Sequence, residues 1–253
     1  MNFNIQPINF NIANVRFKSN SNISQPKGSD LERNPKMDSF EMSIGYVNDA
    51  HGQTNNMMRI LSGIKGDLKL SAGDNDIGDE KNDAIHQATT KFLNIADIKA
   101  SALGNHEIDM SQKDCIDAIN RFNGLMLSIN FEQIPLEEQD PEDIQKYGRA
   151  DLKNHLTKSA VVEVKGEKIG LIGASPIDMM SRLTHPNYYT DCSVDDLDDT
   201  IELIQNEIDK FKEQNINKVI LVSHLGHKAD KFVAENIDGI DVIVGGHTHE
   251  LIK

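Results

Sequence analysis

Asp241-Val-Ile-Val-Gly-Gly-His-Thr-His249 is the stretch that says most about the fold. Its apolar run, Val242 to Val244, is typical of a buried strand, and the glycines that follow let backbone and side chains crowd around something small. Two imidazoles separated by one residue can reach toward one point, and a metal ion is the obvious occupant. A lone His-x-His is weak evidence, because surface histidines pair by chance. The interpretation therefore depends on partners elsewhere in the chain.

Four earlier predicted strands also end in polar residues that can bind metals. Their apolar or alternating patterns place these strands at residues 41–47, 67–72, 99–103 and 218–223. The side chains that follow them are Asp49 and His51, Asp74, Asn105 and His106, and His224. Each alone has an ordinary explanation, such as a helix cap or a turn, but such residues at successive strand exits are hard to obtain by chance. Since open α/β sheets build their sites at the carboxyl ends of strands, we expect them to gather with His247 and His249.

Helical periodicity separates most of these strands. Apolar residues recur with helical spacing at 82–97, 111–122 and 195–213, and His86 is expected on the solvated side of the first helix. Residues 160–173 instead predict a β-hairpin. A hairpin inside an otherwise crossover-type chain indicates an α/β (α+β) fold with a mixed sheet or two sheets.

Composition excludes several classes of function. The 253 residues include 40 acidic and 26 basic ones, for a net charge of −14, so we expect neither a nucleic acid polymer nor an anionic membrane as a partner. An acidic chain that handles phosphate needs local positive charge, which divalent metals supply. The two cysteines, Cys115 and Cys192, form no Cys-x-x-Cys pair and are interpreted as ordinary thiols.

The ends of the chain suggest its domain organisation. Residues 1–40 are rich in Asn, Ser and Pro and are expected to form a poorly ordered tail before a catalytic domain at 41–253. The N-terminus lacks the basic and apolar regions of a signal peptide, and no apolar run reaches membrane-helix length. A cytoplasmic location is the default expectation, and the sequence predicts no oligomeric state.

The ligand types limit the metal. They offer oxygen and imidazole nitrogen but no thiolate, which is unlike a structural zinc site and suits Mn, Fe, Zn or similar ions in a catalytic role. The ligands are too many for one ion. They suit two ions about 3.5–4 Å apart, which clamp the attacking and leaving oxygens of an in-line displacement.

Five ordered motifs resemble those of the calcineurin-like metallophosphoesterases. They are Asp49-x-His51, Gly73-Asp74, Gly104-Asn105-His106-Glu107, Ser223-His224 and Gly246-His247-x-His249. Their surroundings, such as Ala102-Leu-Gly-Asn-His-Glu-Ile-Asp109, resemble the 5′-nucleotidase branch. The resemblance covers roughly residues 43–250 and implies a four-layer α/β/β/α sandwich, in which helices flank two mixed sheets.

The resemblance also implies roles for the motif residues. The first ion would be bound by Asp49, His51 and His249. The second would be bound by Asn105, His224 and His247, and Asp74 would bridge both. A metal-bound hydroxide would attack phosphorus in line. His106, oriented by Asp109, would stabilise the developing charge or protonate the leaving oxygen.

The implied function is that of a dimetal 5′-nucleotidase-type phosphomonoesterase in nucleotide catabolism, with a small phosphate ester, a nucleotide, as substrate. Two alternatives stay open. The same site could serve a cyclic-nucleotide or other phosphodiesterase or a hydrolase of sulfur esters, or the domain could bind metals without activity. Members of the branch are often exported and carry a second domain that holds the substrate. Since nothing follows Lys253, the chain is expected to be truncated and to lack that nucleotide-specificity domain.

Overall fold

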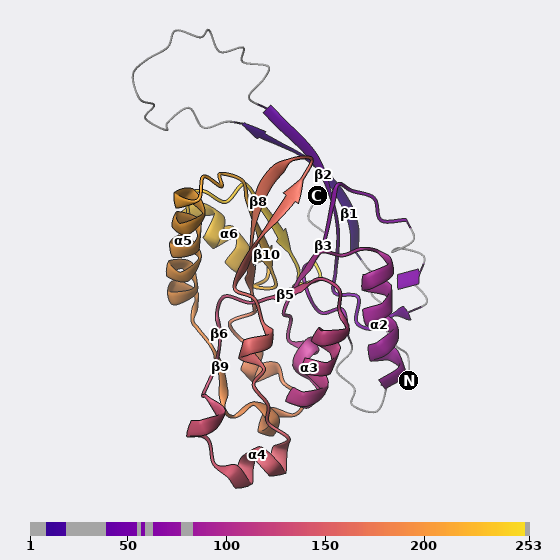
Figure 1. Cartoon of the computed structure of the whole chain (residues 1–253), viewed down its shortest axis with the longest axis vertical. Helices are drawn as coiled ribbons and strands as arrows, with labels where there is room; N and C mark the ends of the chain where they lie inside the picture. The colour runs from indigo at the N-terminus through magenta and orange to yellow at the C-terminus, as the bar shows by residue number, and fades with distance from the viewer. Residues whose placement is uncertain (1–8, 19–38, 55–56, 59–62, 77–82, 251–253) are drawn as a thin grey trace.

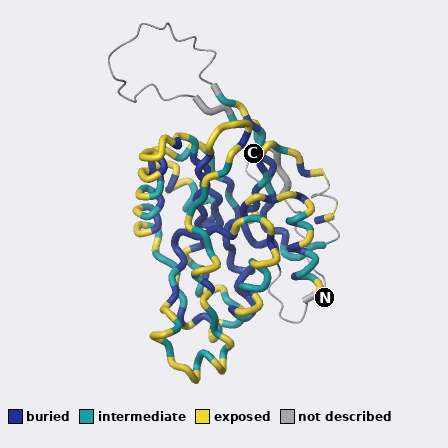
Figure 2. Tube along the Cα trace, in the orientation of Figure 1, coloured by how far each residue is buried: buried dark blue, intermediate teal, exposed yellow. Residues whose placement is uncertain are grey.

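Two β-sheets face each other in the computed structural model, and helices cover their outer faces (Figure 1). The structure describes residues 9–18, 39–54, 57–58, 63–76 and 83–250. Along the trace in Figure 2, the buried residues concentrate in the middle of the molecule, where the sheets lie. The predicted four-layer α/β/β/α sandwich of mixed sheets is confirmed.

The first sheet has the strand order β1-β2-β3-β4-β5. Its strands are β1 (Asn9–Lys18), β2 (Ser39–Asn48), β3 (Leu68–Ser71), β4 (Ala100–Ala102) and β5 (Leu125–Leu127). Strands β2 to β5 run parallel, and β1 pairs antiparallel with β2. The helices α2 (Asp83–Ile95) and α3 (Gln112–Arg121) connect β3 to β4 and β4 to β5, so they provide the crossovers that parallel strands need.

The second sheet has the order β11-β10-β8-β7. Its strands are β7 (Ser159–Val164), β8 (Glu167–Ala174), β10 (Val219–Ser223) and β11 (Val242–Gly245). The predicted hairpin is β7–β8, and β8, β10 and β11 are parallel. The helices α5 (Leu197–Glu213) and α6 (His227–Asn236) are the crossovers of this sheet.

The remaining elements are short. A third, two-stranded sheet pairs β6 (Phe131–Gln133) with β9 (Cys192–Val194), and α4 (Pro141–Tyr147) lies at the end of the molecule near it (Figure 1). The 3-10 helices are η1 (His106–Ile108), η2 (Leu136–Glu138), η3 (Lys153–His155), η4 (Met179–Arg182) and η5 (Pro186–Tyr189). No helix within the described part of the chain is long and apolar enough to span a membrane.

The alternation of side chains along the strands explains why the sheets form layers. On β10, Ile220 and Val222 pack into the core between the sheets, whereas Val219 and Leu221 pack into the core beneath α5 and α6. Leu171 of β8 belongs to the core between the sheets as well. A strand with apolar side chains on both faces must be covered on both. Complete burial of each such side chain contributes about 1.5–3 kcal/mol of transfer free energy.

Two local expectations differ from the structure. The prediction of a poorly ordered tail over residues 1–40 is wrong for Asn9–Lys18, because this segment pairs with β2 along its whole length. Its apolar residues alternate with polar ones in two short runs, a strand signal hidden by the Asn-rich composition. Residues 1–8 and 19–38 lie outside the described residues. The prediction of a solvated His86 is also wrong: it is buried, with Nδ1 2.6 Å from Asp76 Oδ1.

Candidate active site

The predicted ligands follow the carboxyl ends of parallel strands from both sheets. Asp49 and His51 follow β2, Asp74 follows β3, Asn105 and His106 follow β4, His224 follows β10, and His247 and His249 follow β11. The sheets touch at these ends. His224 Nδ1 lies 2.5 Å from the carbonyl oxygen of Ala72, and the backbone N–H of His247 donates to Asp49 Oδ1 at 3.0 Å. The site is therefore built on the contact between the sheets.

One group of possible metal ligands consists of Asp49, His51 and His249, whose ligand atoms lie within 4.8 Å of one another. His249 Nε2 is 3.0 Å from His51 Nε2 and 3.2 Å from Asp49 Oδ1. Two imidazole nitrogens and a carboxylate oxygen this close together can bind one divalent cation.

A second group consists of Asp74, His224 and His247, again with ligand atoms within 4.8 Å. His224 Nε2 lies 3.0 Å from Asp74 Oδ2. Asn105 is buried, and its Oδ1 has no hydrogen-bond partner among the described residues. A buried oxygen of this kind is costly unless a ligand satisfies it. The residues present therefore fit a pair of divalent ions, and Asn105 is suited to the second.

Asp74 lies between these groups. Besides its contact with His224, it forms a third possible ligand group with His51 and His106. Its Oδ1 accepts a hydrogen bond from the backbone N–H of His106 at 2.9 Å. No other carboxylate belongs to more than one of the three ligand groups found among the described residues.

Five of the predicted ligands have left-handed backbone conformations. The φ angles are 52° at Asp49, 45° at His51, 52° at Asp74, 79° at His247 and 52° at His249. Residues other than glycine rarely adopt this region, and each such residue costs of order 1–3 kcal/mol. The sharp turns that result aim side chains from different strands at one point.

Glu107 organises the loops beneath the ligands. It is buried, and its carboxylate accepts hydrogen bonds from the backbone N–H groups of Asp74 at 2.9 Å, Asn75 at 2.7 Å and Gly104 at 2.9 Å. Gly104 has no room for a side chain, since a Cβ there would lie 2.2 Å from Asp74 Oδ1. The sequence predicted no role for Glu107, because these hydrogen bonds link separate strand exits and leave no local pattern.

His106 forms a pair with Asp109. His106 Nδ1 lies 2.6 Å from Asp109 Oδ2, and Asp109 Oδ1 accepts from the backbone N–H of Thr184 at 2.9 Å. Burial alone would lower the pKa of His106, but the hydrogen bond to Asp109 and the charge of Asp74 raise it above its usual value. The arrangement fixes the ring and favours its protonated form.

The charges of the second group depend on one another. Burial disfavours a charged His224, yet Asp74 and Asp49 raise its pKa to about 9. Burial would likewise raise the pKa of Asp74, but His224 lowers it. Metal ligands must be deprotonated, so a cation in this group would replace the proton of His224 as the partner of the carboxylates.

Residues outside the site include the three other histidines that the sequence left without a role. His155 is exposed on η3, His185 packs against Tyr188, and His227 begins α6; none belongs to a ligand group within the described ranges.

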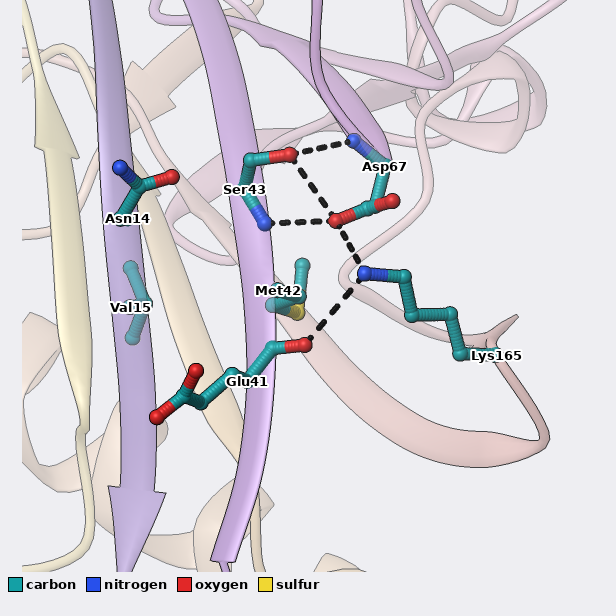
Figure 3. Close-up of a pocket in the computed structure, with 7 residues that line it drawn as sticks. All are labelled: Asn14, Val15, Glu41, Met42, Ser43, Asp67 and Lys165. Atoms are coloured by element: carbon teal, nitrogen blue, oxygen red, sulfur yellow. Dashed lines mark hydrogen bonds and ion pairs between the residues drawn. The ribbon is translucent and has the colours of Figure 1, made fainter.

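The cavity in Figure 3 also lies apart from the ligands, over β1 and β2. There, Lys165 donates to Asp67 Oδ2 at 2.7 Å and ties the turn of the hairpin β7–β8 to the first sheet. No predicted ligand lines this cavity.

Asp178 is a further residue beside the site, and the sequence predicted no role for it. It follows β8 and precedes η4, and its Oδ1 lies 3.3 Å from His247 Nε2. No sequence motif indicates this contact, because it joins the exits of β8 and β11.

Comparison with known proteins gives several relatives that are named 5′-nucleotidases. The chain is 32% identical to a 5′-nucleotidase of Diplobatis ommata over 162 residues, which cover 64% of this chain and 25% of that protein. It is 27% identical to a probable 5′-nucleotidase of Treponema pallidum, with 84% of this chain and 37% of that protein covered. The similarity therefore lies with the 5′-nucleotidase branch, as the motifs predicted. The chain spans well under half the length of either relative.

A solved structure of a 5′-nucleotidase is also similar to this chain. The 5′-nucleotidase precursor from Thermus thermophilus matches with a TM-score of 0.65 and 25% sequence identity, over 83% of this chain and 42% of that one. The family model of the calcineurin-like phosphoesterases matches residues 42–251, a range that contains every ligand group described above. The chain belongs to the calcineurin-like phosphoesterase family.

Proposed function

We propose that this chain hydrolyses phosphate monoesters, with nucleotides as the substrate class, and uses two divalent ions at the candidate site. The observation that carries the proposal is the position of Asp74 between ligand groups from both sheets, together with the unsatisfied oxygen of Asn105. The relatives named as 5′-nucleotidases support the substrate class. When bound, two such ions would neutralise phosphate oxygens and lower the pKa of an attacking water.

Besides the two ions, the catalytic group would be His106. Its Nδ1 is engaged by Asp109, so Nε2 remains to donate a proton to the leaving oxygen. A pKa above the usual histidine value favours the protonated ring that a general acid requires. Asp109 would hold the ring in position, and the backbone N–H of Thr184 would hold Asp109.

Turnover of the full chain with added Mn²⁺ tests the proposal. We expect release of phosphate from a nucleoside monophosphate and from an aryl phosphate. The His106→Ala variant should be slower by about 10²–10⁴-fold, the usual contribution of a general acid. His155→Ala is the matched control and should keep full activity, because His155 is exposed and belongs to no ligand group among the described residues.

Two results would overturn the proposal. One is metal-dependent release that His106→Ala does not reduce. The other is hydrolysis of a phosphodiester or a sulfur ester without hydrolysis of monoesters, which would retain the family and change the substrate class.

A further inference from the structure

Asp178 contacts His247 from outside the ligand groups. Its Oδ1 lies 3.3 Å from His247 Nε2, and its Oδ2 accepts a hydrogen bond from Arg182 Nε at 2.5 Å. The carboxylate therefore lies between a histidine of the candidate centre and an arginine one turn along the chain. His247 itself belongs to the group with Asp74 and His224.

The backbone around Asp178 is well anchored. Ser175, three residues earlier, is fully buried, and its Oγ donates to the carbonyl oxygen of Leu103 at 2.8 Å. Met179, the next residue, is also fully buried. Buried residues therefore anchor the backbone on both sides of Asp178, whose own side chain is partly exposed.

A histidine ring has two nitrogens, and a contact at one determines the use of the other. The neutral ring carries one N–H, and a carboxylate that accepts this hydrogen bond fixes both the tautomer and the orientation of the ring. If Asp178 accepts a hydrogen bond from Nε2 of His247, which lies 3.3 Å from its Oδ1, the nitrogen left for an ion is Nδ1. The backbone N–H of His247 donates to Asp49 Oδ1 at 3.0 Å, which fixes the residue at its other end.

We propose that Asp178 is a positioning residue, which accepts the Nε2–H of His247 and so presents Nδ1 to the second metal ion. The inference rests on the proposed function only in assuming that an ion binds between Asp74, His224 and His247. Arg182 would hold the second oxygen of Asp178 and keep the carboxylate in place.

The tautomer of His247 is the direct readout. In the metal-free full chain labelled with ¹⁵N-histidine, long-range ¹H–¹⁵N spectra recorded where the ring is neutral should show the Nε2–H tautomer. A His247→Gln spectrum assigns the signals. In Asp178→Ala, His247 should become a mixture of tautomers, while Asp178→Asn, which keeps an acceptor oxygen, should retain most of the wild-type signal.

Metal affinity is the second readout, measured calorimetrically with Mn²⁺ and without substrate. Asp178→Ala should lower the affinity for the second ion by about 10–100-fold, the usual effect of removing such a carboxylate. The affinity for the first ion should not change. Asp209→Ala is the matched control: like Asp178, Asp209 is ion-paired with a basic residue, at 2.8 Å from Lys212, but it lies on α5. It should change neither the tautomer nor the affinity.

An unchanged His247 tautomer in Asp178→Ala would overturn the proposal, even if the affinity fell, because the carboxylate would then act on the ion directly. An unchanged affinity for the second ion would overturn it as well. Neither measurement requires turnover. If the chain hydrolysed no substrate, the proposed function would be wrong, but the role of Asp178 could still be tested.

Discussion

Three carboxylates near the site, of which Asp74 and Glu107 are buried and Asp230 is half-buried, differ in how their surroundings shift their pKa values. Burial would raise the pKa of Asp74, but His224 lowers it. His224 lowers the pKa of Glu107 as well, but burial and the charge of Asp74 outweigh this effect and raise the pKa to about 7. Asp230, on α6, accepts a hydrogen bond from Ser223 Oγ, and burial raises its pKa to about 6. At the scale of single residues, the balance between burial and the surrounding charges decides which acid stays ionised.

Asp230 gives a prediction about pH. Its pKa rises from 3.8 in the unfolded chain to about 6 in the fold, so the folded state holds the proton more tightly. Stability due to this group is therefore present below about pH 4 and is lost as the pH rises through 6. Asp230→Asn mimics the protonated acid. Its unfolding free energy should exceed that of the wild type by an amount that grows from pH 4 to pH 7, to roughly 3 kcal/mol at most.

Urea unfolding at a series of pH values measures this difference. The control is Asp238→Asn, which neutralises an exposed aspartate and should give a difference that does not change with pH. A pH-independent difference for Asp230→Asn would show that the Asp230 carboxyl keeps its ordinary pKa in the fold.

At the scale of elements, α5 lies so close to β8 that one strand position must be glycine. A Cβ at Gly170 would lie 2.6 Å from Cδ2 and Cε2 of Phe211, a residue that is 2% exposed. Phe211 shares its apolar core with Ile204 and Ile208 of the same helix and with Ile172 of β8. The contact therefore determines how closely the helix packs on the sheet.

Gly170→Ala should lower the free energy of unfolding by about 1–3 kcal/mol, because the added methyl group overpacks the core. In the background of Phe211→Leu, which removes the ring, the same substitution should cost less. A double-mutant cycle by chemical denaturation measures this coupling. If Gly170→Ala alone raised the free energy of unfolding, the prediction would be contradicted. Replacing a strand glycine with alanine has that stabilising effect where there is space for the methyl group.

The elements could largely be predicted from the sequence, and so could the residues at their ends. Periodicity located the strands before Asp49, Asp74 and His224, because each strand is buried and its exit is polar. The pairing of Asn9–Lys18 with β2 depends on a partner strand, which composition alone does not reveal. Glu107 and Asp178 act through contacts between different strand exits, so no local pattern points to their roles.

At the scale of the whole molecule, the candidate ligands come from both sheets. Asp74 comes from the first sheet, and His224 and His247 come from the second. An ion bound by this group would connect the two sheets and stabilise the folded state by mass action.

Chelation should therefore lower the melting temperature of the Mn²⁺-loaded protein. An ion present at 100 times its Kd adds about 2.7 kcal/mol, which corresponds to roughly 5–10 °C for a domain of this size. Thermal unfolding with and without a chelator measures the change. Asp74→Asn, which removes the charge shared by two ligand groups, should show little or no change. An equal change in both proteins would contradict the role of Asp74 as a shared ligand.

The division of the ligands between the sheets has a consequence for biosynthesis. A nascent chain that has emerged as far as Asn105 carries several of the ligands, but the partners of Asp49 and Asp74 on the second sheet do not yet exist. His249, which completes the first group, follows His51 by 198 residues. The two ligand groups that draw on both sheets therefore remain incomplete until β11 and the turn after it have been synthesised, so ions that need these groups would bind only then.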